Sequence, residues 1–437
     1  MKHPAMKRFA LNFICKNEAH IIGRMLESAR PITDLIVAVD TGSTDKTIQV
    51  IEEFGRKHQI PTYVYDRPFD NFCHSRNYAL DRLRDEVDRL GWPAEDTWWF
   101  WFDCDEELVI DPAFSKASII ADMYYVRSIA GEITYSKQLF LTLAKPLYWV
   151  GPVHEYVEEG ELTVSKEVVS TIQVVYEKVG ASWKGDLVKK FLFYVDALKA
   201  YVNEGHRVFR WVFYIGESYS SAASHCEERS RKMELLRAAK VAYLETQQIE
   251  TNWRDDRYLV FMRLGANMDL LNEDWNDIRT MFLQAHTADK RHAEPIARII
   301  EKYMAAGAWR VAYMVTSFAA SAYHQMKPTD KDVSELDDKL YHYQLMYYHY
   351  CAAMLAGRSK EGKAAYQELV RLLKETPEVF RPTDAKAIRA NGPAILSWQG
   401  RIYRARKRLS GLIRNLTRPR QRIDSIQRAE SLLPIPI

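Results

Sequence analysis

The first 110 residues alternate between short apolar runs and segments whose apolar residues recur at helical spacing. The apolar runs predict four strands, over residues 8–15, 35–39, 62–65 and 98–102. The segments between them predict helices, with Asn17 as N-cap of the first and Ser43 or Thr44 as N-cap of the second. Strands and helices that alternate in this way are typical of a right-handed parallel α/β sheet.

Beyond residue 110 the pattern changes. Residues 123–129, 133–143 and 162–175 alternate between apolar and polar positions, as antiparallel strands do. From Ser182 onward almost every segment has helical periodicity. These changes predict an α/β domain over residues 1–180, a helical domain over 181–400 and a separate C-terminal segment over 401–437.

A weak repeat runs through the helical part. Trp275 and Trp309 are 34 residues apart, and the same spacing relates Ala285 to Ala319. That period, with small residues where helices approach, is typical of tetratricopeptide-like helix pairs, and packed helices of another kind are the alternative. A further pair is expected over residues 341–373, after an insertion near 327–339.

Composition is that of a globular protein, with 437 residues, 47% apolar residues and a net charge of +3. Such a near balance gives no general case for a nucleic-acid or membrane partner. Five scattered cysteines without a CxxC pair argue for a reducing compartment and against a disulfide framework or zinc site. No apolar run reaches transmembrane length and no signal-peptide core is visible, so a cytoplasmic protein is expected.

The segment that begins at Arg401 and ends at Arg422 carries nine Lys and Arg residues and no acid. One interpretation is a solvated arm. The other is an amphipathic helix, because four residues inside the segment would form one apolar stripe: Leu409, Leu412, Ile413 and Leu416. Such a helix would bind an anionic surface, either a membrane or a nucleic acid.

The fourth predicted strand ends in a cluster of acids. Five consecutive aromatic residues over 98–102 are followed by Asp103 and Asp105, and then by two glutamates. Ligands bind at the carboxyl ends of parallel strands. Because the two aspartates are two residues apart, their side chains point the same way in an extended chain, and their backbone positions are about 6–7 Å apart. The pair can therefore hold Mg²⁺ or Mn²⁺, and a solvated acidic turn is the alternative.

Polar residues also follow the second predicted strand, where residues 40–45 read Asp-Thr-Gly-Ser-Thr-Asp. A strand end that meets a helix N-terminus presents backbone amides to an anion or to a base edge. The sequence contains no Gly-rich dinucleotide loop, phosphate-binding GxxxxGK[ST] loop or HExxH pair.

Five blocks carry a resemblance to a known family: residues 15–18, residues 40–45, Phe72 with Arg76 and Asn77, residues 103–106, and the Gly-Pro-Val-His-Glu loop at 151–155. Together they resemble family-2 glycosyltransferases of the GT-A fold, over about residues 8–160. The fifth block is similar to the Gly-x-Val-His-Glu loop of a branch with tetratricopeptide-like helices after the catalytic domain. The resemblance implies a Rossmann-like mixed sheet followed by a helical domain.

The resemblance also implies residue roles in the donor site. Asp40 would bind the nucleotide base or ribose, and Asn17 and Glu18 would shape that pocket. Arg76 would contact the nucleotide. The expected donor is a nucleotide sugar, with a UDP-sugar as the first candidate.

The remaining implied roles belong to the reaction itself. Asp103 and Asp105 would bind the Mn²⁺ or Mg²⁺ that bridges the diphosphate, with Asp105 as the more direct ligand. His154 would add a metal or diphosphate contact. Glu155 would be the general base that takes a proton from the acceptor hydroxyl, and Glu106 is among the flanking acids that remain alternatives. The reaction would invert the anomeric centre.

The acceptor could be a glycan, a protein side chain or a modified nucleic-acid base. A helical scaffold that only recognises a nucleotide or glycan is the alternative to an enzyme. A nucleotidyltransferase is a third reading, but it normally needs a Gly/Arg-rich loop near its start, and none is visible.

Overall fold

The computed structural model describes residues 7–130, 133–177, 179–251, 254–324, 326 and 337–396. The chain forms two compact units, Met1–Glu250 and Thr251–Ile437. Strands give way to helices near residue 180, whereas the units divide after Glu250, so the first three helices beyond the sheet belong to the same unit as the sheet.

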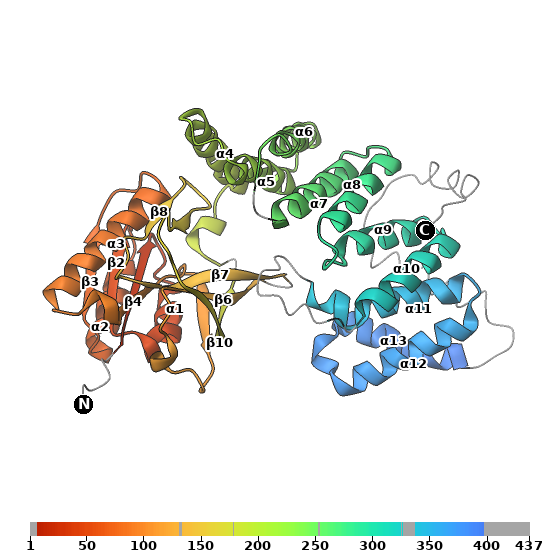
Figure 1. The fold of residues 1–437 in the computed structure, drawn as a ribbon, viewed down its shortest axis with the longest axis horizontal. Coiled ribbons are helices and arrows are strands. Elements are labelled where there is room, and N and C mark those ends of the chain that lie inside the picture. Colours follow the sequence, from red (N-terminus) through yellow and green to blue (C-terminus); the bar gives the residue numbers. More distant parts are fainter. Residues whose placement is uncertain are drawn as a thin grey trace. The chain divides into compact units, whose positions relative to one another are not determined.

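A mixed eight-stranded sheet forms the centre of the first unit, in the order β3-β2-β1-β4-β7-β6-β10-β5 (Figure 1). Strands β1 to β4 are parallel to one another, and β7 joins β4 in antiparallel orientation. A separate hairpin pairs β8 with β9. The strands are β1 Arg8–Cys15, β2 Leu35–Asp40, β3 Thr62–Asp66, β4 Thr97–Phe100, β5 Glu106–Ile110, β6 Met123–Ala130, β7 Ile133–Thr142, β8 Tyr148–Val150, β9 Tyr156–Glu158 and β10 Lys166–Tyr176.

Helices cover both faces of the parallel half of the sheet. Strand β1 alternates strictly: Phe9 and Leu11 pack with α1 (Ile22–Ala29) and α2 (Thr47–His58), whereas Ala10 packs with α3 (Phe72–Arg89). Because successive side chains of a strand point to opposite faces, one buried strand serves two apolar cores.

The predicted helix caps were wrong. Helix α1 begins at Ile22 without a side-chain cap. Asn17 instead has a φ of 57°, and its Oδ1 accepts from the backbone amide of Thr44 at 2.7 Å. At the start of α2 it is Asp45, and not Ser43 or Thr44, that accepts from the amide of Thr47, at 2.9 Å. Asn tolerates the left-handed region, so it suits a turn as well as a cap.

Strands β1 to β3 lie where the apolar runs predicted them, whereas β4 begins one residue earlier than predicted and ends at Phe100, two residues before the end of the predicted run. Strands β6 and β7 are antiparallel as expected. The prediction for residues 162–175 was partly wrong, because β10 pairs with β5 in antiparallel orientation but with β6 in parallel. A mixed sheet followed by helices is thus the architecture of the chain.

The first unit ends with helices α4 (Leu187–Asn203), α5 (Phe209–His225) and α6 (Arg229–Thr246). Their shared core contains Val195, Trp211 and Ala242. Val153, from the loop between β8 and β9, is part of the same core. This packing fixes the loop against the helices.

The second unit is entirely helical in its described residues. Its helices are α7 Arg254–Leu270, α8 Trp275–Ala288, α9 Glu294–Ala305, α10 Trp309–Tyr323, α11 Leu345–Leu355, α12 Ser359–Glu375 and α13 Pro382–Leu396. Helices α8 and α10 begin at the two tryptophans of the 34-residue spacing, and Ala285 and Ala319 are both fully buried. Most of the predicted insertion at 327–339 and the basic segment at 401–422 lie outside the described residues.

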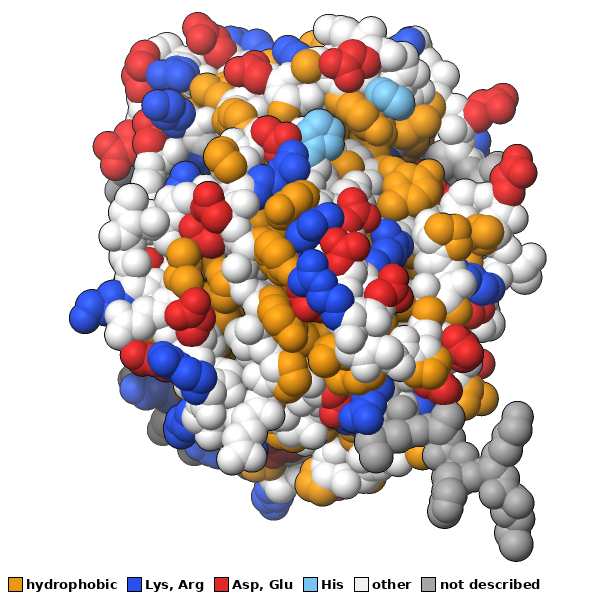
Figure 2. Space-filling model, turned by 90° about the vertical axis from the view of Figure 1, so that its left-hand side faces the viewer, with side chains coloured by type: hydrophobic (Ala, Val, Ile, Leu, Met, Phe, Trp, Pro, Cys, Tyr) orange, Lys and Arg blue, Asp and Glu red, His pale blue; other side chains and the backbone are white. Residues whose placement is uncertain are grey.

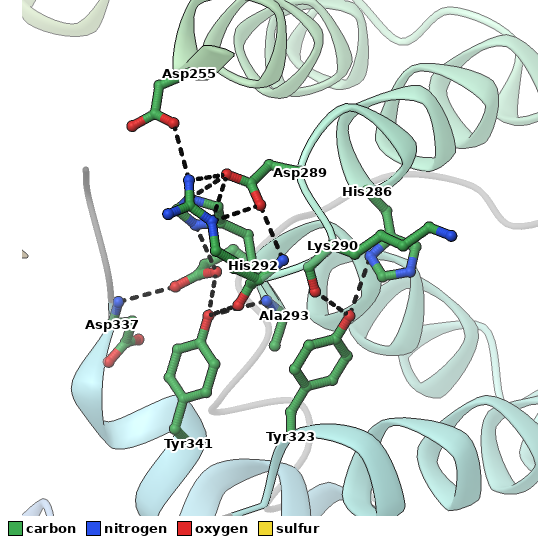
Figure 3. Close-up of polar contacts among 11 residues, drawn as sticks. Asp255, His286, Asp289, Lys290, His292, Ala293, Tyr323, Asp337 and Tyr341 are labelled. Atoms are coloured by element: carbon green, nitrogen blue, oxygen red, sulfur yellow. Dashed lines mark hydrogen bonds and ion pairs between the residues drawn. The ribbon is translucent and has the colours of Figure 1, made fainter. Parts of the chain in front are cut away.

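A buried polar cluster joins several helices of the second unit (Figure 3). Arg291 bonds Asp289 with a shortest contact of 2.5 Å and reaches Asp255 of α7 at 3.3 Å. Tyr341 accepts from the amide of Ala293 at 2.9 Å. Because an unpaired buried charge is costly, this cluster fixes how the helices pack.

On the face drawn in Figure 2, acidic and basic side chains lie interspersed among apolar ones. None of the helices in the described part of the chain has the length and apolar character that a membrane crossing needs.

Candidate active site

The predicted site residues lie at the carboxyl ends of the parallel strands. Asp40 is the last residue of β2 and stands opposite Cys15, the last residue of β1. Asn17 and Glu18 follow β1 directly, and Asp103 comes three residues after the end of β4. Since β1 lies between β2 and β4, these residues gather along one edge of the sheet.

Asp40 shapes the turn that follows it. Its Oδ2 accepts from the backbone amides of Gly42, at 3.0 Å, and Ser43, at 2.8 Å. Gly42 has a φ of 105°, which favours glycine. The buried carboxylate therefore holds a tight turn between β2 and α2.

The segment after β1 is bonded to this turn and to the segment after β10. The amide of Asn17 donates to Ser43 Oγ at 2.9 Å, and that of Glu18 donates to Thr47 Oγ1 at 2.8 Å. The carboxylate of Glu18 accepts from the amide of Ala181 through both oxygens, at 2.9 and 3.1 Å. Burial raises the pKa of Glu18, against the effect of that hydrogen bond.

Arg76 is the centre of the site. Its Nε donates to Glu155 Oε1 at 2.5 Å, and its Nη2 donates to Asp103 Oδ1 at 2.7 Å. The guanidinium lies 4.7 Å from the ring centroid of Trp101 and 5.0 Å from that of Trp149. One buried cation from α3 therefore joins two acids that belong to distant parts of the sequence.

The charges at this centre are interdependent. Burial by itself lowers the pKa of Arg76, but the carboxylates of Asp103 and Glu155 raise it above its ordinary value. Conversely, burial raises the pKa of Asp103, but Arg76 and Lys137 bring it below the ordinary value of a carboxyl. Asp103 is therefore ionised at neutral pH while 48% of its side chain remains exposed.

A second ion pair stabilises the acidic turn that follows β4. Lys137 of β7 bonds the carboxylate of Glu106, and both side chains are buried. Glu106 Oε2 also accepts from the amide of Asp103 at 2.7 Å. Because its carboxylate bonds Lys137 and the backbone amide of Asp103, Glu106 stabilises the conformation of the turn.

Asp105 has a different environment. Its side chain is buried, and burial together with the charges of Asp103 and Glu106 raises its pKa to about 7. Gly180 lies so close that a Cβ added there would stand 2.9 Å from Asp105 Oδ2. The segment after β10 thus covers Asp105, and a side chain at position 180 would require the segment or the carboxylate of Asp105 to shift.

The loop at 151–155 presents Glu155 to Arg76. Gly151 has a φ of 95°, and a Cβ there would overlap the indole ring of Trp211. The ring of His154 stacks on that of Tyr214, with centroids 4.1 Å apart. Burial and the nearby charges of α4 and α5 lower the pKa of His154 to about 3, so the ring is neutral.

Asn77 holds the hairpin that carries this loop. Its Oδ1 accepts from the amide of Trp149 at 2.8 Å, and its Nδ2 donates to the carbonyl of the same residue at 2.9 Å. Arg76 and Asn77 are neighbours in α3 but have different partners. Arg76 bonds the carboxylate of Glu155, and Asn77 bonds the backbone of Trp149 in β8.

Helix α4 brings to the site two residues that the sequence patterns did not identify. Tyr194 lies edge-on to the ring of His154, with centroids 5.7 Å apart. Lys190 precedes Tyr194 by one turn, and its charge contributes to the lowered pKa of both Asp103 and His154. Neither residue lies in a recognisable motif, and only the fold reveals that α4 faces the strand ends.

The predicted residues therefore form three contacting groups. Arg76, Asp103 and Glu155 are bonded directly. Asn17 bonds the turn that Asp40 shapes, and Glu18 and Asp105 both contact the segment at 180–181. His154 contacts the tyrosines of α4 and α5.

The two aspartates suit a hard divalent cation. Among the described residues, no group of three or more His, Cys, Asp or Glu side chains is arranged to hold a metal ion. Mg²⁺, however, usually takes one or two protein carboxylates and completes its shell with water and substrate phosphates. Asp103 keeps a second carboxylate oxygen beyond its bond to Arg76, and Asp105 is buried among acids. The pair fits an ion that binds together with a phosphorylated substrate.

Comparison with known proteins gives limited matches. No protein-family model matches the chain. A TPR repeat-containing protein of Synechococcus elongatus is 25% identical over 171 residues, which are 37% of this chain and 38% of that protein. The chain thus matches well under half the length of this curated relative.

Among solved structures, S. aureus TarS has a TM-score of 0.31 at 14% identity, covering 66% of this chain and 54% of that one. Residues 1–349 of TarS have a TM-score of 0.30 at 12% identity, covering 76% and 97%. The same part of TarS in complex with UDP has a TM-score of 0.27 at 12% identity, covering 72% and 89%. TM-scores of this size do not establish a shared fold.

Proposed function

We propose that the chain is a family-2-like glycosyltransferase of the GT-A fold, which moves a sugar from a nucleotide-sugar donor to an acceptor hydroxyl. The observation that carries the proposal is the pair of hydrogen bonds that the guanidinium of Arg76 donates, one to Asp103 and one to Glu155. A transferase of this kind needs an acid on the donor side and a base on the acceptor side at a fixed separation. The guanidinium of Arg76 bonds both carboxylates, and this supports the proposal.

Donor binding is assigned to the strand ends. The turn shaped by Asp40 presents backbone amides next to the N-terminus of α2, where a base edge or phosphate is favoured. Asn17 holds this turn, and Glu18 ties the segment after β10 to it. These contacts give Asn17 and Glu18 a positioning role around the nucleotide.

Asp103 and Asp105 are the residues that would hold Mn²⁺ or Mg²⁺. Bound there, the ion would neutralise negative charge that develops on the departing nucleoside diphosphate. His154 has the neutral imidazole that metal ligation requires, and its predicted contact stays a prediction.

Glu155 is the proposed general base. Its Oε1 is bonded to Arg76, and a carboxylate has a second oxygen that can accept the proton of an acceptor hydroxyl. With Arg76 fixing the carboxylate, little motion is needed when the hydroxyl attacks the anomeric carbon. Attack from the face opposite the leaving group inverts that carbon.

The first experiment measures release of nucleoside diphosphate from a panel of nucleotide sugars, with Mn²⁺ and with excess chelator. We expect release from at least one donor, dependent on the metal and abolished in Asp105→Asn. The alternative function, a scaffold that binds a nucleotide or glycan without catalysis, predicts binding without release from any donor.

The acceptor is a glycan, a protein or a modified nucleic acid. The basic segment from Arg401 to Arg422 stays a predicted contact to an anionic surface. Deletion after Gly400 tests it, with binding to anionic vesicles and to DNA measured across a salt series against the full chain.

A further inference from the structure

Two segments lie side by side at the strand ends, residues 15–19 after β1 and residues 41–47 after β2. The carbonyl of Cys15 accepts from the amide of Thr41 at 2.9 Å and from its hydroxyl at 3.1 Å. Further hydrogen bonds between the two segments join Asn17 to Ser43, Glu18 to Thr47 and Ala19 to Asp45. The backbone at Lys16 is therefore fixed by bonded residues on both sides of it.

The side chain of Lys16 lies over the turn that Asp40 shapes. Its Nζ is 3.9 Å from the position that a Cβ on Gly42 would take. Lys16 is exposed, and within the described part of the chain its ammonium forms no hydrogen bond or ion pair. A full positive charge thus lies beside this turn, where a ligand can reach it.

The order of the strands places Lys16 in the middle of the candidate site. Strand β1 lies between β2 and β4, so Lys16 follows the strand between the turn of Asp40 and the acidic turn at residues 103–105. Under the proposed function the nucleoside lies at the first turn and the divalent cation at the second. The phosphate next to the ribose would then lie between the two turns, on the side of Lys16.

A phosphate in this acidic site needs a cation that is not already bonded to a buried acid. Arg76 bonds Asp103 and Glu155, and Lys137 bonds Glu106. Moving either cation would leave a buried carboxylate without its partner, which is costly. The exposed ammonium of Lys16 can meet a phosphate without that cost, and its flexible stem suits a ligand that enters and leaves.

We propose that Lys16 binds the phosphate next to the ribose of the donor, and that this contact does not need the divalent cation. The inference rests on the proposed function, because it assigns a cation to the nucleotide of the same site. The chain itself then supplies a part of the phosphate affinity that remains when the metal is removed.

Calorimetric titration of the full chain with uridine, UMP and UDP, all in excess chelator, tests the assignment. Lys16→Gln should weaken UMP and UDP binding to the same extent, roughly 10- to 100-fold, because a charge-assisted hydrogen bond to their shared phosphate is lost. Uridine binding should not change. Lys16→Arg keeps the charge and should retain most of the affinity. Lys57→Gln removes an exposed lysine from the last turn of α2 and is the matched control.

Each outcome decides the inference. Equal losses for UMP and UDP in Lys16→Gln, with thermal unfolding like that of the control, support it. Unchanged UMP affinity, an equal loss for uridine, or an equal loss in Lys16→Arg overturns it while leaving the proposed function standing. If UDP does not bind, the series is repeated with the phosphates of whichever of GDP, ADP, CDP and dTDP binds. If none of the five binds even with Mn²⁺, the proposed function fails together with the inference.

Discussion

Arg76 Nε and Glu155 Oε1 are 2.5 Å apart, and both side chains are almost wholly buried, with 6% and 10% exposed. A charge-assisted hydrogen bond of this kind is strong and directional. It connects the helix after the third strand with a loop 79 residues later, and so it determines how the two halves of the site meet.

The first prediction concerns the stability of this pair. Arg76→Met leaves the carboxylate of Glu155 buried without its cation, and the loss of one partner of a buried pair costs roughly 3–5 kcal/mol. Chemical denaturation of the sheet-containing unit measures this cost. Arg82→Met removes an arginine from a partly exposed ion pair of the same helix and should cost less than about 1 kcal/mol. Equal effects of the two substitutions would contradict the assignment of Arg76 as the buried centre.

The second prediction concerns the base. Glu155→Gln should lower turnover roughly 10²–10⁴-fold, the usual contribution of general base catalysis, and leave donor affinity nearly unchanged. Glu159→Gln, on a partly exposed glutamate after the same hairpin, should have no such effect. A collapse of donor binding in Glu155→Gln would place Glu155 in the donor site instead.

The third prediction concerns Gly180. Alanine fits the backbone there, but its Cβ would stand 2.9 Å from Asp105 Oδ2, so either the segment or the carboxylate must shift. We expect Gly180→Ala to lower metal-dependent nucleotide affinity about tenfold or more. Gly185→Ala has no atom within 4 Å of the new Cβ and is the control. Equal nucleotide affinities in the two variants would show that metal-dependent nucleotide binding does not depend on the close approach of Gly180 to Asp105.

The fourth prediction concerns the helical unit. Arg291 bonds Asp289 and Asp255, whose carboxylates are almost fully buried. Arg291→Met should therefore destabilise this unit by roughly 3–5 kcal/mol. Arg298→Met removes an exposed arginine that pairs with the partly exposed Glu301, and it should change the free energy of unfolding by less than about 1 kcal/mol. Unfolding of the unit at the wild-type denaturant concentration in both variants would refute the structural role of Arg291.

Much of the fold could be predicted because its signals are local. The parallel strands are continuous apolar runs, and a run buried on both faces needs no knowledge of its neighbours. Strand β4 is shorter than its aromatic run, because Trp101 and Phe102 lie beyond its last residue, Phe100. Burial by the surrounding structure, and not strand pairing, accounts for those two aromatic residues.

The missed features depend on contacts between distant residues. Asn17 is compatible with a cap and with a left-handed turn, and only the position of Thr44 decides between them. The expected contact of Arg76 with the nucleotide stays a prediction, and nothing in the local sequence of Arg76 indicates that Asp103 and Glu155 converge on it. Gly180 matters because it lies close to Asp105, and no local pattern encodes that contact.

The central claim is that the strand ends bind a nucleoside diphosphate together with a divalent cation. Its most direct test is calorimetric titration of the full chain with UDP, GDP, ADP, CDP and dTDP, each with Mn²⁺ and with excess chelator. We predict that at least one nucleoside diphosphate binds, that Mn²⁺ tightens it by about tenfold or more, and that Asp105→Asn abolishes this gain. Absence of binding for all five, or binding that neither the chelator nor Asp105→Asn alters, would contradict the claim.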